Sequence, residues 1–228
     1  MRVLGLDTAT AACSAAVWAD GRVLALRTVA MERGHAEALM PMIVEVLEEA
    51  GCGFADLDLL AATIGPGAFT GLRVGLAAAR GMALACARPC VGVTTLEGIA
   101  GRADRSELAS RMLLVALHSR RAELYVQGFD GTGAASGSPA AVLPENLAGV
   151  VTGPAVVVGD AAAEATDALA AAGIDAAIGS APAVADPGIV AAIAASRWAA
   201  GGDVRPPAPL YLRPPDAVRP RNGGRLRP

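Results

Sequence analysis

Ile64–Gly81 reads IGPGAFTGLRVGLAAARG, which is the end of an apolar strand, a glycine-rich turn and a helix of small residues. Gly65 and Gly67 can take backbone angles that other residues resist, and Thr70 is placed to cap a helix that starts near Gly71. Such a turn can aim several backbone N–H groups at one point, where a phosphate could bind. Glycine turns without a ligand are the more common case in α/β proteins, so both interpretations stay open.

The helix within this stretch predicts a contact surface. Gly75 and Gly81 each destabilise a helix by about 1 kcal/mol relative to alanine, so packing has to compensate. Together with the many alanines between residues 77 and 85, they form a smooth surface on which another helix can lie very close. We therefore expect another helix to pack against this one.

The segments around this stretch predict strands and helices in the order β-β-β-α-β-α-β-α. Asp20-Gly21 is a two-residue hairpin signal between the second and third strands. Three antiparallel strands followed by alternating helices and strands is the ribonuclease-H-like arrangement. The expected strands are 2–8, 13–19, 22–30, 57–64 and 89–93, and the expected helices are 35–50, 71–86 and a short one opened by a capping box at 94–97.

A second, smaller set of elements follows the polar stretch 102–111. Its expected strands are 111–117, 122–129 and 154–159, and its expected helices are 161–172 and 186–200. Because strands again precede helices, this half looks like a trimmed copy of the first. The sequence therefore predicts an α/β, two-lobed actin-like fold.

We expect an N-terminal lobe at 1–104, a shortened C-terminal lobe at 105–213 and an extended, proline- and arginine-rich tail at 214–228. Leu210-Tyr211-Leu212 is the apolar part of the end of the chain and is expected to dock on the body.

Composition excludes several classes of protein. With 54% hydrophobic and 18% charged residues among 228, the chain has ample material for a core and is not a disordered protein. Only 3% of residues are aromatic and the net charge is −3, which argues against a dedicated nucleic-acid binder. The N-terminus has no signal-peptide pattern and no apolar run could span a membrane, so we expect a cytoplasmic protein.

The cysteine pattern agrees with that location. Cys13, Cys52, Cys86 and Cys90 form no C-x-x-C pair, and Cys13 and Cys86 fall in expected core segments. We therefore expect buried, reduced thiols and neither a disulfide nor a zinc site.

Asp7 and Thr8 stand where an actin-like ATPase places a phosphate-binding loop. With Gly65, Gly67 and Thr70 they are candidates for a vestigial phosphate loop, although Asp7 can also simply cap the turn that follows it. The second half shows no clear glycine-rich loop for an adenosine. We therefore expect no cofactor for the chain alone and weak or absent nucleotide binding.

Six ordered pieces of the sequence resemble one family. They are LGLDTAT at 4–10, HAEALMP at 35–41, DLDLLAATIGPGAFTGLRVGLAAARGMALA at 56–85, VGVTTLEGIA at 91–100, RRAELYV at 120–126 and PLYLR at 209–213. The chain is similar to the TsaB (YeaZ) family, non-catalytic partner subunits in bacterial tRNA threonylcarbamoyladenosine synthesis. The resemblance covers the chain from end to end, and the central block is its most specific part.

The resemblance implies an actin-like fold with a shortened second lobe, and binding to a TsaD-like catalytic subunit. It also implies a TsaE-like ATPase in the larger complex, tRNA contacted indirectly, and nucleotide held only at a junction of the assembled complex. The same surface can support a homodimer when the partner is absent. The implied interface residues are His35, Leu39, Met40, Ile43, Leu72, Arg73, Gly75, Leu76 and Ala79, with Gly75 permitting close approach of another helix.

The catalytic relatives carry a metal-binding His-x-x-x-His pair on a helix, and this chain departs from that pattern. Leu39 stands four residues after His35, so we expect no catalytic residue and no metal site here. His118 lies in a turn where the family usually has an acidic or amide residue. The alternative function is a self-sufficient enzyme of the same fold, either a small-molecule kinase or a metallopeptidase.

Overall fold

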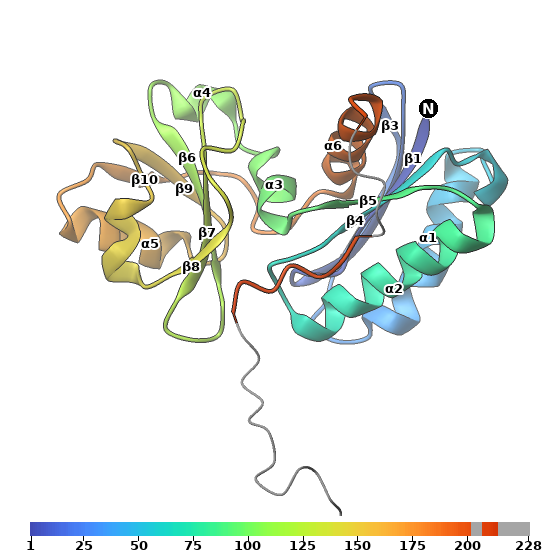
Figure 1. Ribbon diagram of the computed structural model, residues 1–228, viewed down its shortest axis with the longest axis horizontal. Helices are drawn as coiled ribbons and strands as arrows, with labels where there is room; N and C mark the ends of the chain where they lie inside the picture. Colours follow the sequence, from blue (N-terminus) through green and yellow to red (C-terminus); the bar gives the residue numbers. More distant parts are fainter. Residues whose placement is uncertain (202–206, 214–228) are drawn as a thin grey trace, which may run out of the picture.

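The structure is a computed structural model, and it describes residues 1–201 and 207–213. The chain forms two lobes, each built around a five-stranded sheet (Figure 1). The tail expected at 214–228 lies outside the described residues.

The first sheet follows the order expected from the sequence. Its strands run in the order β3-β2-β1-β4-β5, with β1, β2 and β3 antiparallel and β1, β4 and β5 parallel. Asp20 and Gly21 have φ values of 47° and 87°, the positive angles of the expected two-residue hairpin. The strands are β1 (Arg2–Asp7), β2 (Ala12–Ala19), β3 (Arg22–Ala30), β4 (Leu59–Thr63) and β5 (Cys90–Val93).

Helices cover both faces of this sheet because its central strands are apolar on both sides. Helices α1 (His35–Glu49) and α2 (Phe69–Cys86) lie side by side on one face, and α6 (Pro187–Ala199) lies on the other (Figure 1). A short 3-10 turn, η1 (Phe54–Asp56), joins α1 to β4. The core between α1, α2 and the sheet is therefore a closed layer of buried apolar side chains.

The second lobe repeats the plan of the first. Its sheet order is β10-β9-β6-β7-β8, which is the same order when the strands are counted from β6. The strands are β6 (Met112–His118), β7 (Leu124–Phe129), β8 (Ala140–Val142), β9 (Ala155–Val158) and β10 (Ala176–Ile178), and the helical elements are η2 (Pro144–Gly149) and α5 (Ala162–Ala171). Strands β8 and β10 were not expected, because three residues are too short for a visible alternation.

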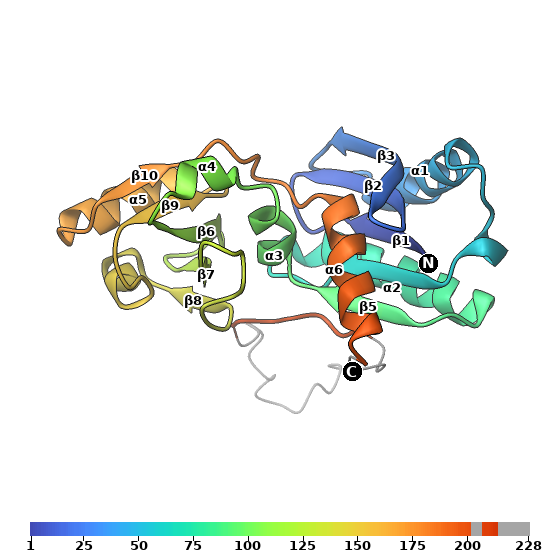
Figure 2. The ribbon, with the colours of Figure 1, turned by 90° about the horizontal axis from the view of Figure 1, so that it is seen from above.

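Two short helices connect the lobes. Helix α3 (Thr95–Ala100) lies between them in both views, and α4 (Arg105–Leu108) opens the second lobe (Figures 1 and 2). The capping box expected at 94–97 is present, with Thr94 Oγ1 accepting from the Glu97 amide at 3.1 Å. Glu97 also pairs with Arg197, which ties α3 to α6.

The expected boundary of the second lobe, 105–213, is wrong at its C-terminal end. Val190, Ala191 and Ala194 of α6 pack against Val3 and Leu59 of the first sheet. Residues 207–213 also return to the first lobe. The expected docking of this apolar segment is confirmed, because the Leu210 amide donates to the Ile64 carbonyl at 2.7 Å.

Among residues 1–201 and 207–213, the structure contains no helix with both the length and the apolar character needed to cross a membrane. All four cysteines are free; Cys13 and Cys90 are buried, whereas Cys86, expected in the core, is half-buried like Cys52. Burial raises the pKa of the Cys90 thiol to about 12.

Candidate docking surface and the Asp7 turn

The glycines of the central turn allow it to touch the loop after β1 through backbone atoms. A Cβ built on Gly67 would lie 2.3 Å from the Ala9 carbonyl oxygen, and one on Gly71 would lie 2.0 Å from the Thr8 carbonyl oxygen. The Ala68 amide donates to the Ala9 carbonyl at 2.8 Å, and Thr8 Oγ1 donates to the Gly71 carbonyl at 2.7 Å. The glycine pattern is therefore needed for packing within the chain.

Thr70 does not cap α2. The helix begins at Phe69, two residues before the expected start at Gly71, with Ala68 at the capping position and no side-chain cap. Thr70 therefore lies within the first turn, where its side chain is exposed.

Asp7 is enclosed by its own chain. Its carboxylate accepts hydrogen bonds from Thr63 Oγ1 at 2.6 Å, Thr10 Oγ1 at 2.6 Å and the Ala9 amide at 3.1 Å. Burial raises the pKa of the Asp7 carboxyl above its ordinary value, while these hydrogen bonds oppose that rise. Both Asp7 and Thr8 are 1% exposed, so the expected phosphate loop is wrong as a surface site: its polar side chains join β1 to β4 and α2.

Most of the expected interface residues lie inside the first lobe. The apolar stripe of each helix that the sequence pattern identifies is the stripe that faces its own sheet, so these side chains cannot contact another chain directly. They are His35, Leu39, Ile43, Leu72, Gly75, Leu76 and Ala79. Gly75 is buried, and each of the other six is at most 8% exposed. Met40, which is 42% exposed, and Arg73 are the two expected residues that lie on the surface.

A different set of apolar side chains forms the outer face of α1 and α2. Met40 and Val44 of α1 are 42% and 41% exposed, and Phe69 and Leu84 of α2 are 56% and 85% exposed. Gly81 of α2 is also exposed, and a Cβ built on it would have no described atom within 4 Å apart from those of its own stretch of helix. An outer face with several large exposed apolar groups is typical of an interaction surface. We call this set the α1–α2 face.

Charge is separated across the α1–α2 face. The exposed charged residues of α1 are all acidic: Glu37, Glu45, Glu48 and Glu49. Those on and just after α2 are all basic: Arg73, Arg80 and Arg88. A surface with one acidic helix beside one basic helix is complementary to another surface with the same arrangement.

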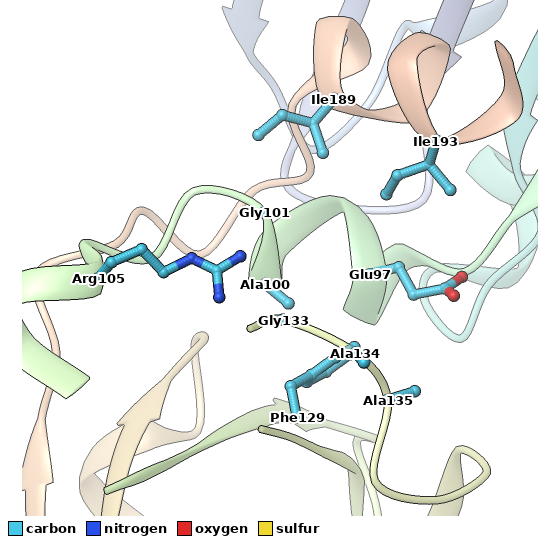
Figure 3. Close-up of a pocket in the computed structure, with 10 residues that line it drawn as sticks. All are labelled: Glu97, Ala100, Gly101, Arg105, Phe129, Gly133, Ala134, Ala135, Ile189 and Ile193. Carbon is cyan, nitrogen blue, oxygen red and sulfur yellow. The ribbon is translucent and has the colours of Figure 1, made fainter. Parts of the chain in front are cut away.

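A cavity of about 310 Å³ lies between α3, α6 and the loop after β7 (Figure 3). Its walls are mainly apolar, and Arg105 and Glu97 stand at its edges. Arg105 Nη1 already donates to the Gly131 carbonyl at 2.8 Å, and Glu97 is held by Thr94 and Arg197. No local sequence pattern predicts this cavity, because its lining comes from segments far apart in the chain.

The two histidines lie in different lobes. His35 begins α1, and its Nε2 atom is buried with no hydrogen-bond partner among the residues that the structure describes. His118 is exposed at the end of β6, with Nδ1 3.5 Å from a carboxylate oxygen of Glu164. In the described part of the chain, no three side chains of His, Cys, Asp or Glu are grouped so that they could hold a metal ion. The side chain four residues after His35 is Leu39, which cannot ligate a metal and is 1% exposed.

Known proteins are similar to this chain in sequence and architecture. The TsaD family, described as tRNA N6-adenosine threonylcarbamoyltransferase, matches residues 28–184. The tRNA threonylcarbamoyladenosine biosynthesis protein TsaB of Escherichia coli is 42% identical over 125 residues, which are 55% of this chain and 53% of that protein. The matched stretch thus spans about half the length of that relative. An uncharacterized protein of Mycobacterium tuberculosis is 35% identical over 221 residues, covering 94% of this chain and 93% of its own.

The solved structure of YeaZ from Pseudomonas aeruginosa has a TM-score of 0.76 and 28% identity, covering 92% of this chain and 99% of that one. Together with the repeated strand order of the two sheets, this likeness confirms the expected two-lobed actin-like, ribonuclease-H-like fold.

Proposed function

Because the chain belongs to the TsaD family of tRNA N6-adenosine threonylcarbamoyltransferases and has relatives named TsaB, we propose that it is a non-catalytic subunit of tRNA threonylcarbamoyladenosine synthesis. In this role it binds and activates a TsaD-like catalytic subunit. The observation that carries the proposal is the α1–α2 face, which is apolar and charge-separated on the outside of the first lobe.

A TsaD-like partner suits this face because a member of the same family can present the same pair of helices. When the helix pairs of two chains face each other about an approximate two-fold axis parallel to the helices, α1 of one chain lies against α2 of the other. The glutamates of α1 then meet a basic helix, and the arginines of α2 meet an acidic one. The same geometry supports a homodimer when the partner is absent.

The proposed non-catalytic role is supported by the start of α1. The family resemblance places a metal-binding His-x-x-x-His pair there in catalytic members, and the second position in this chain is the buried Leu39. The residues present therefore do not fit that metal, and no chemical step is assigned to this helix. We propose that the partner supplies catalysis and the main tRNA contacts.

The larger complex completes the proposal. A TsaE-like ATPase joins the pair, and nucleotide is held only at a junction between subunits, because Asp7 and Thr8 of this chain are enclosed by their own lobe. We propose a cytoplasmic location, which suits four free thiols.

A matched pair of surface variants tests the docking face. Leu84→Glu places a charge at an 85% exposed position of α2, and Ile178→Glu does the same at a 60% exposed position of β10 in the other lobe. We expect Leu84→Glu to weaken binding to the TsaD-like subunit by at least about tenfold, and Ile178→Glu to leave it unchanged, as measured by calorimetry. Equal binding by both variants would contradict the proposed face.

A second experiment separates this role from the alternative of a self-sufficient enzyme. Deleting the coding sequence should abolish threonylcarbamoyladenosine in total tRNA, and the Leu84→Glu variant should restore it less well than Ile178→Glu. Turnover of ATP or of a peptide by the isolated chain, with the modified nucleoside unaffected by deletion, would favour the kinase or the metallopeptidase instead.

A further inference from the structure

The segment 207–213 lies across the first lobe and reaches the second (Figure 1). Pro207 is buried beside Gly92, and a Cβ built on Gly92 would lie 3.0 Å from the Cβ of Pro207. Leu210 is hydrogen-bonded to Ile64 through its amide at 2.7 Å, and Arg213 Nε lies 3.7 Å from a carboxylate oxygen of Glu123 in the second lobe. The segment is therefore fixed against the turn that precedes α2.

This docking brings Tyr211 to the first turns of α2. Arg73 lies over the Phe69 ring, with 3.6 Å from its guanidinium carbon to the ring centroid. Arg73 Nε also donates to the Tyr211 hydroxyl at 3.1 Å, and the two rings are 5.8 Å apart. Three side chains separated by up to 142 positions in the sequence thus form one cluster on the surface.

The cluster gathers the exposed aromatic side chains of the described residues. Phe69 is 56% exposed and Tyr211 is 49% exposed, and the other aromatic side chains within 1–201 and 207–213 are buried or half-buried. Aromatic residues and arginine are enriched at the centres of protein–protein interfaces, where they contribute most of the binding energy.

The cluster continues the face already proposed for the partner. Positions 69, 73, 77, 80 and 84 recur every three or four residues, so they share one side of α2, and all five are exposed. At the Phe69 end of that side, Tyr211 of the C-terminal segment lies next to Phe69 and Arg73. The α1–α2 face therefore extends onto the docked C-terminal segment.

We propose that residues 207–213 form part of the docking surface for the TsaD-like subunit, with Tyr211 as a positioning residue that holds Arg73 over Phe69. This inference rests on the function proposed above. A free arginine side chain loses much rotamer freedom when a partner immobilises it, and the bonds to Phe69 and Tyr211 fix it before binding. The partner surface opposite is acidic and apolar, because α2 exposes arginines and no acidic residue.

A double-mutant cycle tests this role. Tyr211→Phe removes the hydroxyl that accepts from Arg73 but keeps the ring, and Tyr125→Phe in β7 is the matched control for the chain's other tyrosine. We expect Tyr211→Phe to weaken binding to the TsaD-like subunit by roughly 3- to 10-fold in the wild-type background. In the Arg73→Ala background it should have no further effect, and the Tm of each variant should stay within a few degrees of wild type.

The outcomes are distinct. Unchanged binding by Tyr211→Phe, or an equal loss in both backgrounds, overturns the positioning role. Failure of the wild-type chain to bind the subunit at all contradicts the proposed function instead. Because aromatic and arginine side chains also stack on bases, the same variants are titrated with an anticodon stem-loop RNA. Loss of RNA binding with full subunit affinity would overturn the proposal in favour of an RNA contact.

Discussion

Thr8 occupies the space that a side chain on Gly75 would need, because a Cβ built there would lie 2.4 Å from Thr8 Oγ1. The sequence suggested that Gly75 leaves room for a helix of another chain. Instead, the room is filled by the loop after β1 of the same lobe. Gly81, two turns nearer the end of α2, is the glycine that faces outward.

These two glycines give opposite predictions for stability. Gly75→Ala should lower the free energy of unfolding by about 1–3 kcal/mol, because Thr8 cannot move without disturbing its hydrogen bond to Gly71. Gly81→Ala should raise it by about 0.5–1 kcal/mol, since alanine favours the helix and its Cβ would meet no described atom beyond its own stretch of helix. Urea unfolding of both variants checks the pair, and equal shifts in the same direction would contradict the packing described.

Asp7 predicts a pH dependence of stability. Because burial raises the pKa of its carboxyl, the folded protein holds that proton more tightly than the unfolded chain does. The stabilisation is complete below the ordinary carboxyl pKa and is lost as the pH rises through the raised value. In the wild-type protein, the free energy of unfolding measured with urea should therefore fall between pH 4 and 8. In Asp7→Asn this fall should be absent.

The alanine variant separates charge from hydrogen bonding. Asp7→Ala leaves the hydroxyls of Thr10 and Thr63 without their acceptor and should be destabilised by about 1–3 kcal/mol across the whole pH range. A stable Asp7→Ala variant would show that these bonds matter little.

Leu39 and Met40 are neighbours in α1 with opposite environments, at 1% and 42% exposure. Leu39→Ala should cost about 2–5 kcal/mol of stability through the cavity it leaves. Met40→Ala should stay within about 0.5 kcal/mol. Thermal unfolding of the two variants measures the difference. Similar melting temperatures would contradict the burial of Leu39 in the first lobe.

The thiols predict a labelling pattern. Burial raises the pKa of Cys90 to about 12, and burial together with the charge of Asp7 raises that of Cys13 to about 11. Both should resist iodoacetamide at pH 8 in the folded protein, because the thiolate is the reactive form. Mass spectrometry of peptides from native and urea-unfolded protein checks this, and rapid native labelling of either residue would contradict it.

The fold was largely predictable because its signals are local. The apolar runs of β1 and β4, the Asp20-Gly21 turn and the Thr94–Glu97 capping box each indicate one element without reference to distant residues. The predictions that were wrong depend on contacts between segments far apart in the sequence. Nothing near α6 in the sequence indicates that it packs on the first sheet, so the sequence alone predicts a second lobe that extends too far along the chain.

The interface residues that the family resemblance implies include several that the structure places inside the first lobe. Hydrophobic periodicity identifies the buried stripe of an amphipathic helix but does not say what buries it. The family resemblance implies that Leu39 and Leu76 contact a partner, whereas the chain's own sheet covers them. Exposed residues such as Leu84 lie off that stripe and become visible as an interaction surface only once the buried set is known.

The repeated strand order hides one difference between the lobes. Between its third and fourth strands the second lobe has the short turn η2, where the first lobe has the fifteen-residue helix α1. If each lobe had a docking face made of two helices, every chain that bound through one face would still have a second face free. Further chains could then add without limit, and the assembly would become a filament. If the α1–α2 face is the docking surface, its presence on the first lobe alone limits assembly through it to two chains.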